Sequence, residues 1–371
     1  MIAASASRLF NDLVNRDLLE AVEAGQWPAD LWQAVNDMGL PDVLLLESED
    51  DPWQQCYEIL REAGRYALPL PLAETMLIRF CLHRFNTVID IHNQQRTPAA
   101  IMTLQQAFST SYASEQPSES ASEHASGIRY ENGRLSGEWR QVAFARHCES
   151  ALVEFSVESG IAIGMINLFS AAGCADASET GAVEIREQET ICGEARDTVT
   201  LHKVKVQILH RSAHSVLLPA LAWMRAVMIS GAVQEVLDMS VRYAGERSQF
   251  GKAIGKFQAI QHALAQLAGE AACATMAAQA AIEFAGLSED IFAPACAKIR
   301  CGEASGKAAA IAHQVHGAIG FTREHQLHFL TRRLWSWRAE YGDERYWAQL
   351  LGKQAIRAAK SKQGLWEWLS A

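Results

Sequence analysis

Three side chains within residues 247–258 have the types and spacing of a site for a ligand that carries phosphate and a flat ring. The planar guanidinium of Arg247 can hold two phosphate oxygens at once. Phe250, which follows Gln249, can lie against a ring, and the side-chain amide of Gln258 can donate to phosphate or to a ring edge. Considered alone, this segment could also be a turn that carries a surface arginine.

A second segment, residues 314–325, reads Gln-Val-His-Gly-Ala-Ile-Gly-Phe-Thr-Arg-Glu-His. The amide of Gln314 offers the same donors as that of Gln258. Gly317 has no side chain, so its backbone N–H can approach an anion closely. The segment therefore adds a second set of polar groups suited to an anionic ligand.

Together the two segments resemble the signatures of the acyl-CoA dehydrogenase superfamily. The first family signature is an Arg followed by Gln-Phe-Gly, a short gap, and Phe-Gln at a helix start, as in residues 247–258. The second is Gln-x-His-Gly-Gly-x-Gly-Tyr, which residues 314–321 match with Ala318 in place of the second Gly. Two long motifs in the family's order make the resemblance specific, while the first two thirds of the chain resemble the family only in outline.

The resemblance implies FAD as the cofactor, an acyl-CoA thioester as the substrate and, as in the family, an electron-transfer flavoprotein as the acceptor. It also implies that FAD lies across a subunit interface, with the two motifs coming from different protomers, so that the chain works as an oligomer. The residues expected to bind FAD are Arg247, Gln249, Phe250, Gln258, Gln314, Val315, His316, Gly317 and Ala318.

The resemblance also directs the search for a catalytic base, because the reaction needs a carboxylate to remove the proton alpha to the thioester carbonyl. One family position for that carboxylate falls on Tyr341, just before Gly342, and the adjacent Glu340 is the candidate base. The other lies on the helix before Arg247, where residues 198–234 contain no Asp or Glu. A Thr-Glu-Pro segment followed by Gly-Ser-Asp, usual in the family, is absent from residues 93–211.

These departures leave several functions open. The chain resembles the partly degenerate subunits of heteromeric dehydrogenases that act on bulky acyl-CoAs such as steroid side chains, in which it would pair with another dehydrogenase-like chain. A homomeric dehydrogenase of fatty acid or steroid side-chain degradation is equally compatible. The alternatives from other classes are a non-enzymatic scaffold on the same fold and a flavin-dependent monooxygenase, which needs no base for an alpha proton.

The four histidines at positions 313, 316, 325 and 328 raise the question of a metal site. Their spacing is not that of His-Glu-x-x-His, and the surrounding Ala-rich sequence offers no obvious carboxylate ligand. We therefore expect that these histidines bind no metal and are ordinary core or surface residues.

The motifs must be positioned by a chain whose periodicity changes twice. Residues 1–92 and 212–371 have apolar residues at helical spacing, as in Phe257, Ile260, Leu264 and Leu267, whereas residues 93–211 contain strand and turn patterns. The order predicts an α+β fold with an N-terminal helical domain (1–92), a central β domain (93–211) and a C-terminal four-helix bundle carrying the FAD motifs (212–371).

Within the central region, Asn132-Gly133 predicts a hairpin turn, and Val204, Val206 and Ile208 alternate with polar residues as on a half-buried strand. Residues 109–126 and 176–181 are expected to be surface loops.

The overall composition limits which partners the protein can bind and in which cell compartment we expect it. The formal net charge of -10 makes nucleic acid an improbable partner. The apolar run from Val216 to Val233 contains Pro219 and Arg225, so a core helix is expected and not a membrane span. No signal peptide is expected at the N-terminus, and the eight scattered cysteines suggest reduced thiols in a cytoplasmic protein.

Overall fold

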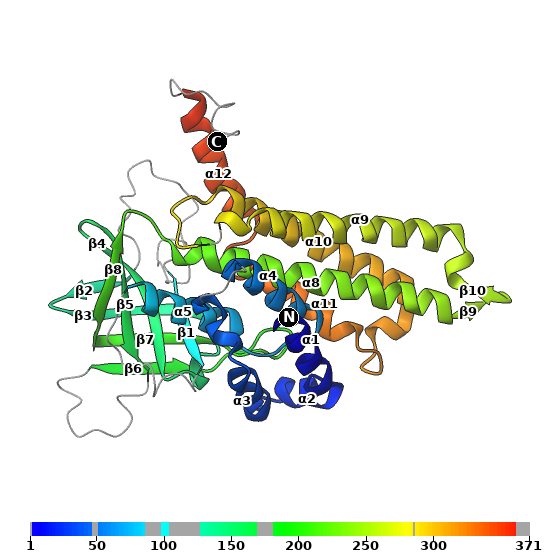
Figure 1. The fold of residues 1–371 in the computed structure, drawn as a ribbon, viewed down its shortest axis with the longest axis horizontal. Coiled ribbons are helices and arrows are strands. Elements are labelled where there is room, and N and C mark those ends of the chain that lie inside the picture. The colour runs from blue at the N-terminus through cyan, green and yellow to red at the C-terminus, as the bar shows by residue number, and fades with distance from the viewer. Residues whose placement is uncertain are drawn as a thin grey trace. The chain divides into compact units, whose positions relative to one another are not determined.

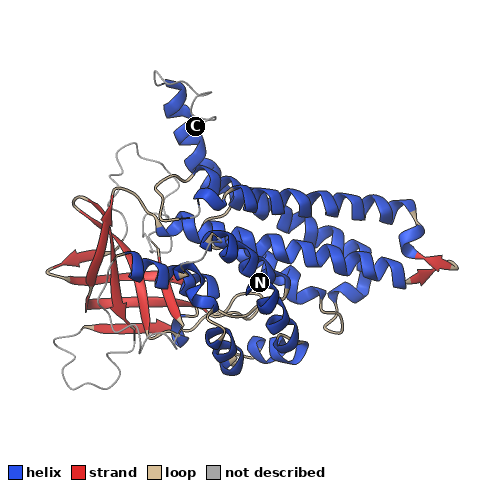
Figure 2. Cartoon of the chain, viewed as in Figure 1, coloured by secondary structure: helices blue, strands red, loops and turns tan. Residues whose placement is uncertain are grey.

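The computed structural model describes residues 2–46, 51–85, 98–103, 127–168, 181–284 and 286–360. The helices, then strands, then helices predicted from the sequence are confirmed (Figure 1, Figure 2). The N-terminal helices are α1 (Ile2–Leu13), α2 (Arg16–Glu23), α3 (Ala29–Asp37), α4 (Pro52–Arg65) and α5 (Leu72–Arg84). The long C-terminal helices are α8 (Leu217–Glu246), α9 (Gln258–Ala280), α10 (Phe292–His316), α11 (Leu327–Ala339) and α12 (Glu344–Lys360).

The chain forms two compact units. The first contains residues 1–59 and 68–221, and the second contains residues 60–67 and 222–371. The second half of α4 therefore belongs to the same unit as the long C-terminal helices. The division into three domains at residues 92 and 211 stays a prediction.

The first unit contains two four-stranded sheets. One has the order β1 (Ala99–Met102), β4 (Ser150–Val157), β5 (Gly160–Asn167), β8 (Gln207–Ser212), and the other the order β2 (Arg129–Glu131), β3 (Arg134–Ala143), β7 (Arg196–Lys205), β6 (Ala182–Arg186). β1 and β4 are parallel, and the other paired strands are antiparallel. One hydrophobic cluster, which includes Trp139 of β3 and Phe155 of β4, draws on both sheets.

The predicted hairpin turn at Asn132-Gly133 is confirmed. These two residues join β2 to β3 and have φ of 51° and 75°, which Asn and Gly tolerate best. The alternation at Val204, Val206 and Ile208 is also present, but it does not form a single strand. The chain leaves β7 after Lys205 and begins β8 at Gln207, so the pattern continues across a switch from one sheet to the other.

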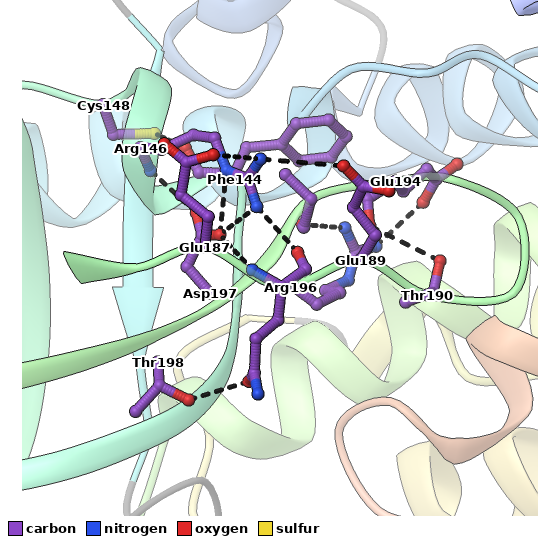
Figure 3. A network of polar contacts seen from close by, with 12 residues as sticks. Phe144, Arg146, Cys148, Glu187, Glu189, Thr190, Glu194, Arg196, Asp197 and Thr198 are labelled. Atoms are coloured by element: carbon purple, nitrogen blue, oxygen red, sulfur yellow. Dashed lines mark hydrogen bonds and ion pairs between the residues drawn. The ribbon is translucent and has the colours of Figure 1, made fainter. Parts of the chain in front are cut away.

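Ion pairs connect the segment at Arg146 with residues 187–197, which include the start of β7 (Figure 3). Arg146 approaches the fully buried Asp197 at 2.6 Å, and Asp197 also accepts the Arg146 backbone N–H at 2.9 Å. Arg196 pairs with Glu194 at 3.0 Å, and both side chains are buried. Because every charge in this group has a partner inside the protein, we assign the network a structural role.

The N-terminus of α8 is capped by a buried carboxylate. Glu154 of β4 accepts the Leu217 backbone N–H at 3.1 Å and the Ser215 hydroxyl at 2.8 Å. By length and composition α8 could cross a membrane, but 94% of its most apolar window is buried inside the structure. It is thus a core helix, as the sequence predicts.

Glycines permit the closest helix packing in the second unit. Gly64 of α4 meets the backbone of Met228, and Gly231 of α8 meets the backbone carbonyl of Arg61, so any side chain at either position would overlap main-chain atoms. Arg65 then pairs with Glu235 at 3.0 Å and Asp238 at 3.1 Å. These contacts attach the end of α4 to the helical bundle.

α10 is the central helix of this bundle, since it contacts α9, α11 and α12. Its many alanines and glycines allow that approach; at Gly302, for example, the carboxylate of Glu344 fills the space a side chain would need. The loop predicted at residues 109–126 lies outside the described residues, as does all of residues 176–181 except Gly181.

Candidate functional site

A cavity of about 620 Å³ in the second unit is lined by both sequence motifs of one chain, whereas the resemblance implied that the two motifs meet from different protomers. Such a volume is within the range of small-molecule sites. Of the nine residues expected to bind a cofactor, eight line the cavity: Arg247, Gln249, Phe250, Gln314, Val315, His316, Gly317 and Ala318. Gln258 is not among the lining residues, although its neighbour Phe257 is.

The first motif is held by a short hairpin after α8, formed by β9 (Ser248–Gln249) and β10 (Lys252–Ala253). Phe250 and Gly251 make its two-residue turn with φ of 51° and 78°. A bulky residue seldom adopts positive φ, and Phe250 is also 89% exposed. A strained backbone that presents an exposed ring favours a binding role for this turn.

Arg247 is exposed at the base of this hairpin. Its backbone is fixed, because its N–H donates to Tyr243 O at 2.9 Å and its carbonyl accepts from Ile254 N at 2.8 Å. Its guanidinium has no ion-pair partner among the described residues. An anchored arginine with a free guanidinium suits an anionic ligand.

Gly317 serves a purpose other than the one we predicted from sequence. Its N–H donates to His313 O, and so ends α10 and is not available to an anion. Its φ of 63° explains why glycine suits this position. The neighbouring backbone is instead what shapes this wall of the cavity.

His316 lies buried behind the same wall. Its ring stacks on Tyr243 with centroids 4.5 Å apart and meets the ring of His325 edge-on at 4.6 Å. Since Ala312 O can only accept, the 2.8 Å contact requires Nδ1 of His316 to be the donor. Burial lowers the pKa of His316; the hydrogen bond to Ala312 O raises it, and His325 and His313 lower it further, so that the pKa lies below its ordinary value.

Residues missed in the sequence complete the cavity: Tyr243, Ile254, Phe257, Ile260 and Ile319. Phe257 and Ile260 flank the first turn of α9, whose N-terminus has no side-chain cap. Uncapped N–H groups at a helix start favour a phosphate. The apolar spacing of Phe257 and Ile260 was visible in the sequence but suggested only packing.

The carboxylate of Glu340 lies elsewhere in the same unit. It is 7% exposed and forms an ion pair with the buried Arg225 of α8, Nε to Oε2, at 3.0 Å. The structure therefore places Glu340 beside Arg225 of α8, the helix before Arg247 on which residues 198–234 contain no Asp or Glu. The assignment of Glu340 as the base stays a prediction.

The four histidines do not form a metal centre in the part of the chain described, where no three His, Cys, Asp or Glu side chains gather. His313 stacks on Phe321 at 4.3 Å, and the ring nitrogen of His328 contacts the carbonyl oxygen of His325 at 2.7 Å. These contacts are those of packing residues.

Comparison with known families finds that residues 215–355 match the C-terminal domain of acyl-CoA dehydrogenases. Over 124 residues the chain is 35% identical to acyl-CoA dehydrogenase IpdE2 of Mycobacterium tuberculosis, covering 31% of this chain and 36% of that protein. Over 97 residues it is 39% identical to glutaryl-CoA dehydrogenase of Desulfococcus multivorans, covering 26% and 25%. These matches thus span about a third or less of each curated relative.

The fold is similar along nearly the whole chain. The Tcur3481-Tcur3483 steroid ACAD has a TM-score of 0.80 with 21% identity, covering 97% of this chain and 98% of that one. The ChsE4-ChsE5 complex from Mycobacterium tuberculosis has a TM-score of 0.76 with 18% identity, covering 96% of both. At this identity the likeness establishes the fold.

Proposed function

We propose that this chain is an FAD-binding subunit of an acyl-CoA dehydrogenase, because residues 215–355 match the C-terminal domain of that family and the fold is that of its solved structures. The observation that carries the proposal is the cavity in which both sequence motifs meet. Its reaction would be the α,β-dehydrogenation of an acyl-CoA thioester.

The lining residues fit FAD in three ways. Arg247 has a free guanidinium for phosphate oxygens, and the uncapped start of α9 offers backbone N–H groups beside it. Phe250 and Tyr243 present ring faces, and Gln249 and Gln314 present amides. When bound, FAD would supply the acceptor for the hydride that leaves the substrate's beta carbon.

The cavity is open on the side of Phe250, which is 89% exposed. An exposed ring on a strained turn suits contact with a second chain, so we propose that the cofactor is shared between chains. The partner would be another copy or another dehydrogenase-like chain, as two different proteins are paired in the ChsE4-ChsE5 complex and in Tcur3481-Tcur3483. A cytoplasmic location and an electron-transfer flavoprotein as acceptor complete the proposal.

The visible absorption spectrum of the purified chain tests this function. We expect stoichiometric flavin either in the chain expressed alone or after co-expression with a dehydrogenase-like partner. A chain that takes up no flavin in either state would be a scaffold and would refute the proposal. Oxygen consumption after flavin reduction would instead identify a monooxygenase.

A further inference from the structure

We propose that Glu340 is a positioning residue: with Arg225 and Lys298 it forms a buried clamp on the turn between α11 and α12, and it is not the general base. The clamp is an inference from packing alone. Only the statement about the base rests on the proposed function.

The first half of the clamp is the Arg225–Glu340 pair. The Glu340 atom Oε2 is 3.0 Å from Arg225 Nε, and Oε1 accepts the Ser336 hydroxyl at 3.4 Å. Arg225, 3% exposed, also lies over the rings of Trp337 and Tyr341, each centroid 5.5 Å away. Both carboxylate oxygens are thus engaged inside the protein, and the guanidinium is enclosed by aromatic rings.

The second half is Lys298 of α10, a fully buried amine. Its Nζ donates to Arg338 O at 2.7 Å and to Gly342 O at 2.8 Å, one carbonyl on each side of Glu340. Burial lowers the pKa of Lys298 to about 8. Two N–H donors remain even on the neutral amine, so both bonds survive loss of the proton.

A third contact fixes the intervening residue. The indole of Trp347 donates to Tyr341 O at 3.0 Å, and Tyr341 has a φ of 54° that only a well-determined turn can hold. The turn is therefore tied at Arg338, Glu340, Tyr341 and Gly342. Groups from three helices, α8, α10 and α12, tie it.

This arrangement opposes base catalysis. On taking a proton, Glu340 would lose its negative charge, and the buried guanidinium of Arg225 would then have no counter-charge in this pair, which is costly. The residues of α8 within 198–234 offer no other carboxylate. Neither Glu340 nor residues 198–234 of the chain therefore offers a free carboxylate for the alpha proton.

A double-mutant cycle tests the clamp on the full-length chain. We expect Arg225→Met and Glu340→Leu each to reduce the ratio of folded to unfolded protein about 100-fold or more in urea unfolding, because each leaves a buried charge alone. The double variant should be at least about tenfold more stable than the sum of the singles implies. Additive effects would overturn the clamp. Glu303→Gln, an exposed α10 carboxylate paired with Arg300, is the matched control.

The role as base is tested by flavin reduction with butyryl-CoA, octanoyl-CoA and glutaryl-CoA. We expect the rate of flavin reduction by each acyl-CoA to be the same in Glu340→Gln as in the wild type. The urea concentration at the unfolding midpoint should be lower in the variant. A loss of about 10²–10⁴-fold in rate with an unchanged unfolding midpoint would make Glu340 the base and overturn the inference. Absence of flavin from the wild type both alone and with a partner chain would instead refute the proposed function, and the cycle would still decide the clamp.

Discussion

Arg247 combines a fixed backbone with a guanidinium that has no ion-pair partner among the described residues. We expect Arg247→Ala to weaken flavin binding by about 10- to 150-fold, since a charge-assisted hydrogen bond contributes about 1.5–3 kcal/mol. Flavin absorbance per protein after gel filtration measures the loss. Arg242→Ala, on the preceding helix α8 and outside the cavity wall, should retain its flavin. Equal occupancy in the two variants would remove Arg247 from the site.

His316 makes a prediction about pH at the same scale. Its folded-state pKa is below the ordinary value of 6.5, so the unfolded chain binds the proton more readily. Stability from this residue is then complete above pH 6.5 and is lost as the pH falls below it.

We therefore expect the melting temperature of the wild type to decrease as the pH is lowered below 6.5. The decrease should be less steep in His316→Phe, which keeps an aromatic ring against Tyr243. His262→Phe, at an exposed site on α9, is the control. Parallel curves for the wild type and His316→Phe would contradict the assignment.

At the scale of elements, the crossing of α4 and α8 depends on having no side chain at Gly231. We expect Gly231→Ala to cost about 1–3 kcal/mol of unfolding free energy, because the methyl group would force the two backbones apart. Gly245→Ala, in open space near the end of the same helix, should instead gain up to about 1 kcal/mol from helix propensity. Urea unfolding compares them, and an unaffected Gly231 variant would show that the helices do not cross so closely.

The sequence was sufficient for elements with a strong local pattern. The hairpin at Asn132-Gly133 follows from backbone preference, and the long C-terminal helices follow from periodicity. It was not sufficient where a long-range contact decides the outcome. Nothing near Lys205 indicates that the chain changes sheets at Val206, because the same alternation suits both ladders.

The residues of the candidate site likewise fall into those that the sequence predicted and those that only the fold reveals. The motifs predicted eight of the cavity's lining residues because they lie in two short stretches. Tyr243 and Ile260 are apolar or aromatic positions at helical spacing, which packing alone would explain. The pairing of Arg225 with Glu340 joins residues more than a hundred positions apart, and only the fold reveals it.

For the whole molecule, the exposed ring of Phe250 at the cavity mouth argues against a working monomer. We expect the flavin-loaded protein to be at least a dimer by multi-angle light scattering. We also expect Phe250→Ser to lower both flavin content and oligomer mass, because the same ring would serve the cofactor and the second chain. Phe284→Ser, at another exposed ring outside the cavity lining and outside both motifs, is the control. A monomer with full flavin would contradict the shared site.

The end of α4 has a consequence for how this protein can be made and cut. Residues 60–67 complete the unit formed by residues 222–371, yet the ribosome produces them before the whole of residues 68–221. Residues 60–67 therefore remain without their packing partner, with Gly64 exposed, until α8 has been synthesised. A fragment that begins at residue 222 would lack residues 60–67, and the surface at Gly231, which contacts Arg61 in the whole chain, would be exposed. A fragment that starts at residue 222 should therefore aggregate. Addition of residues 60–67 as a separate peptide should restore its solubility.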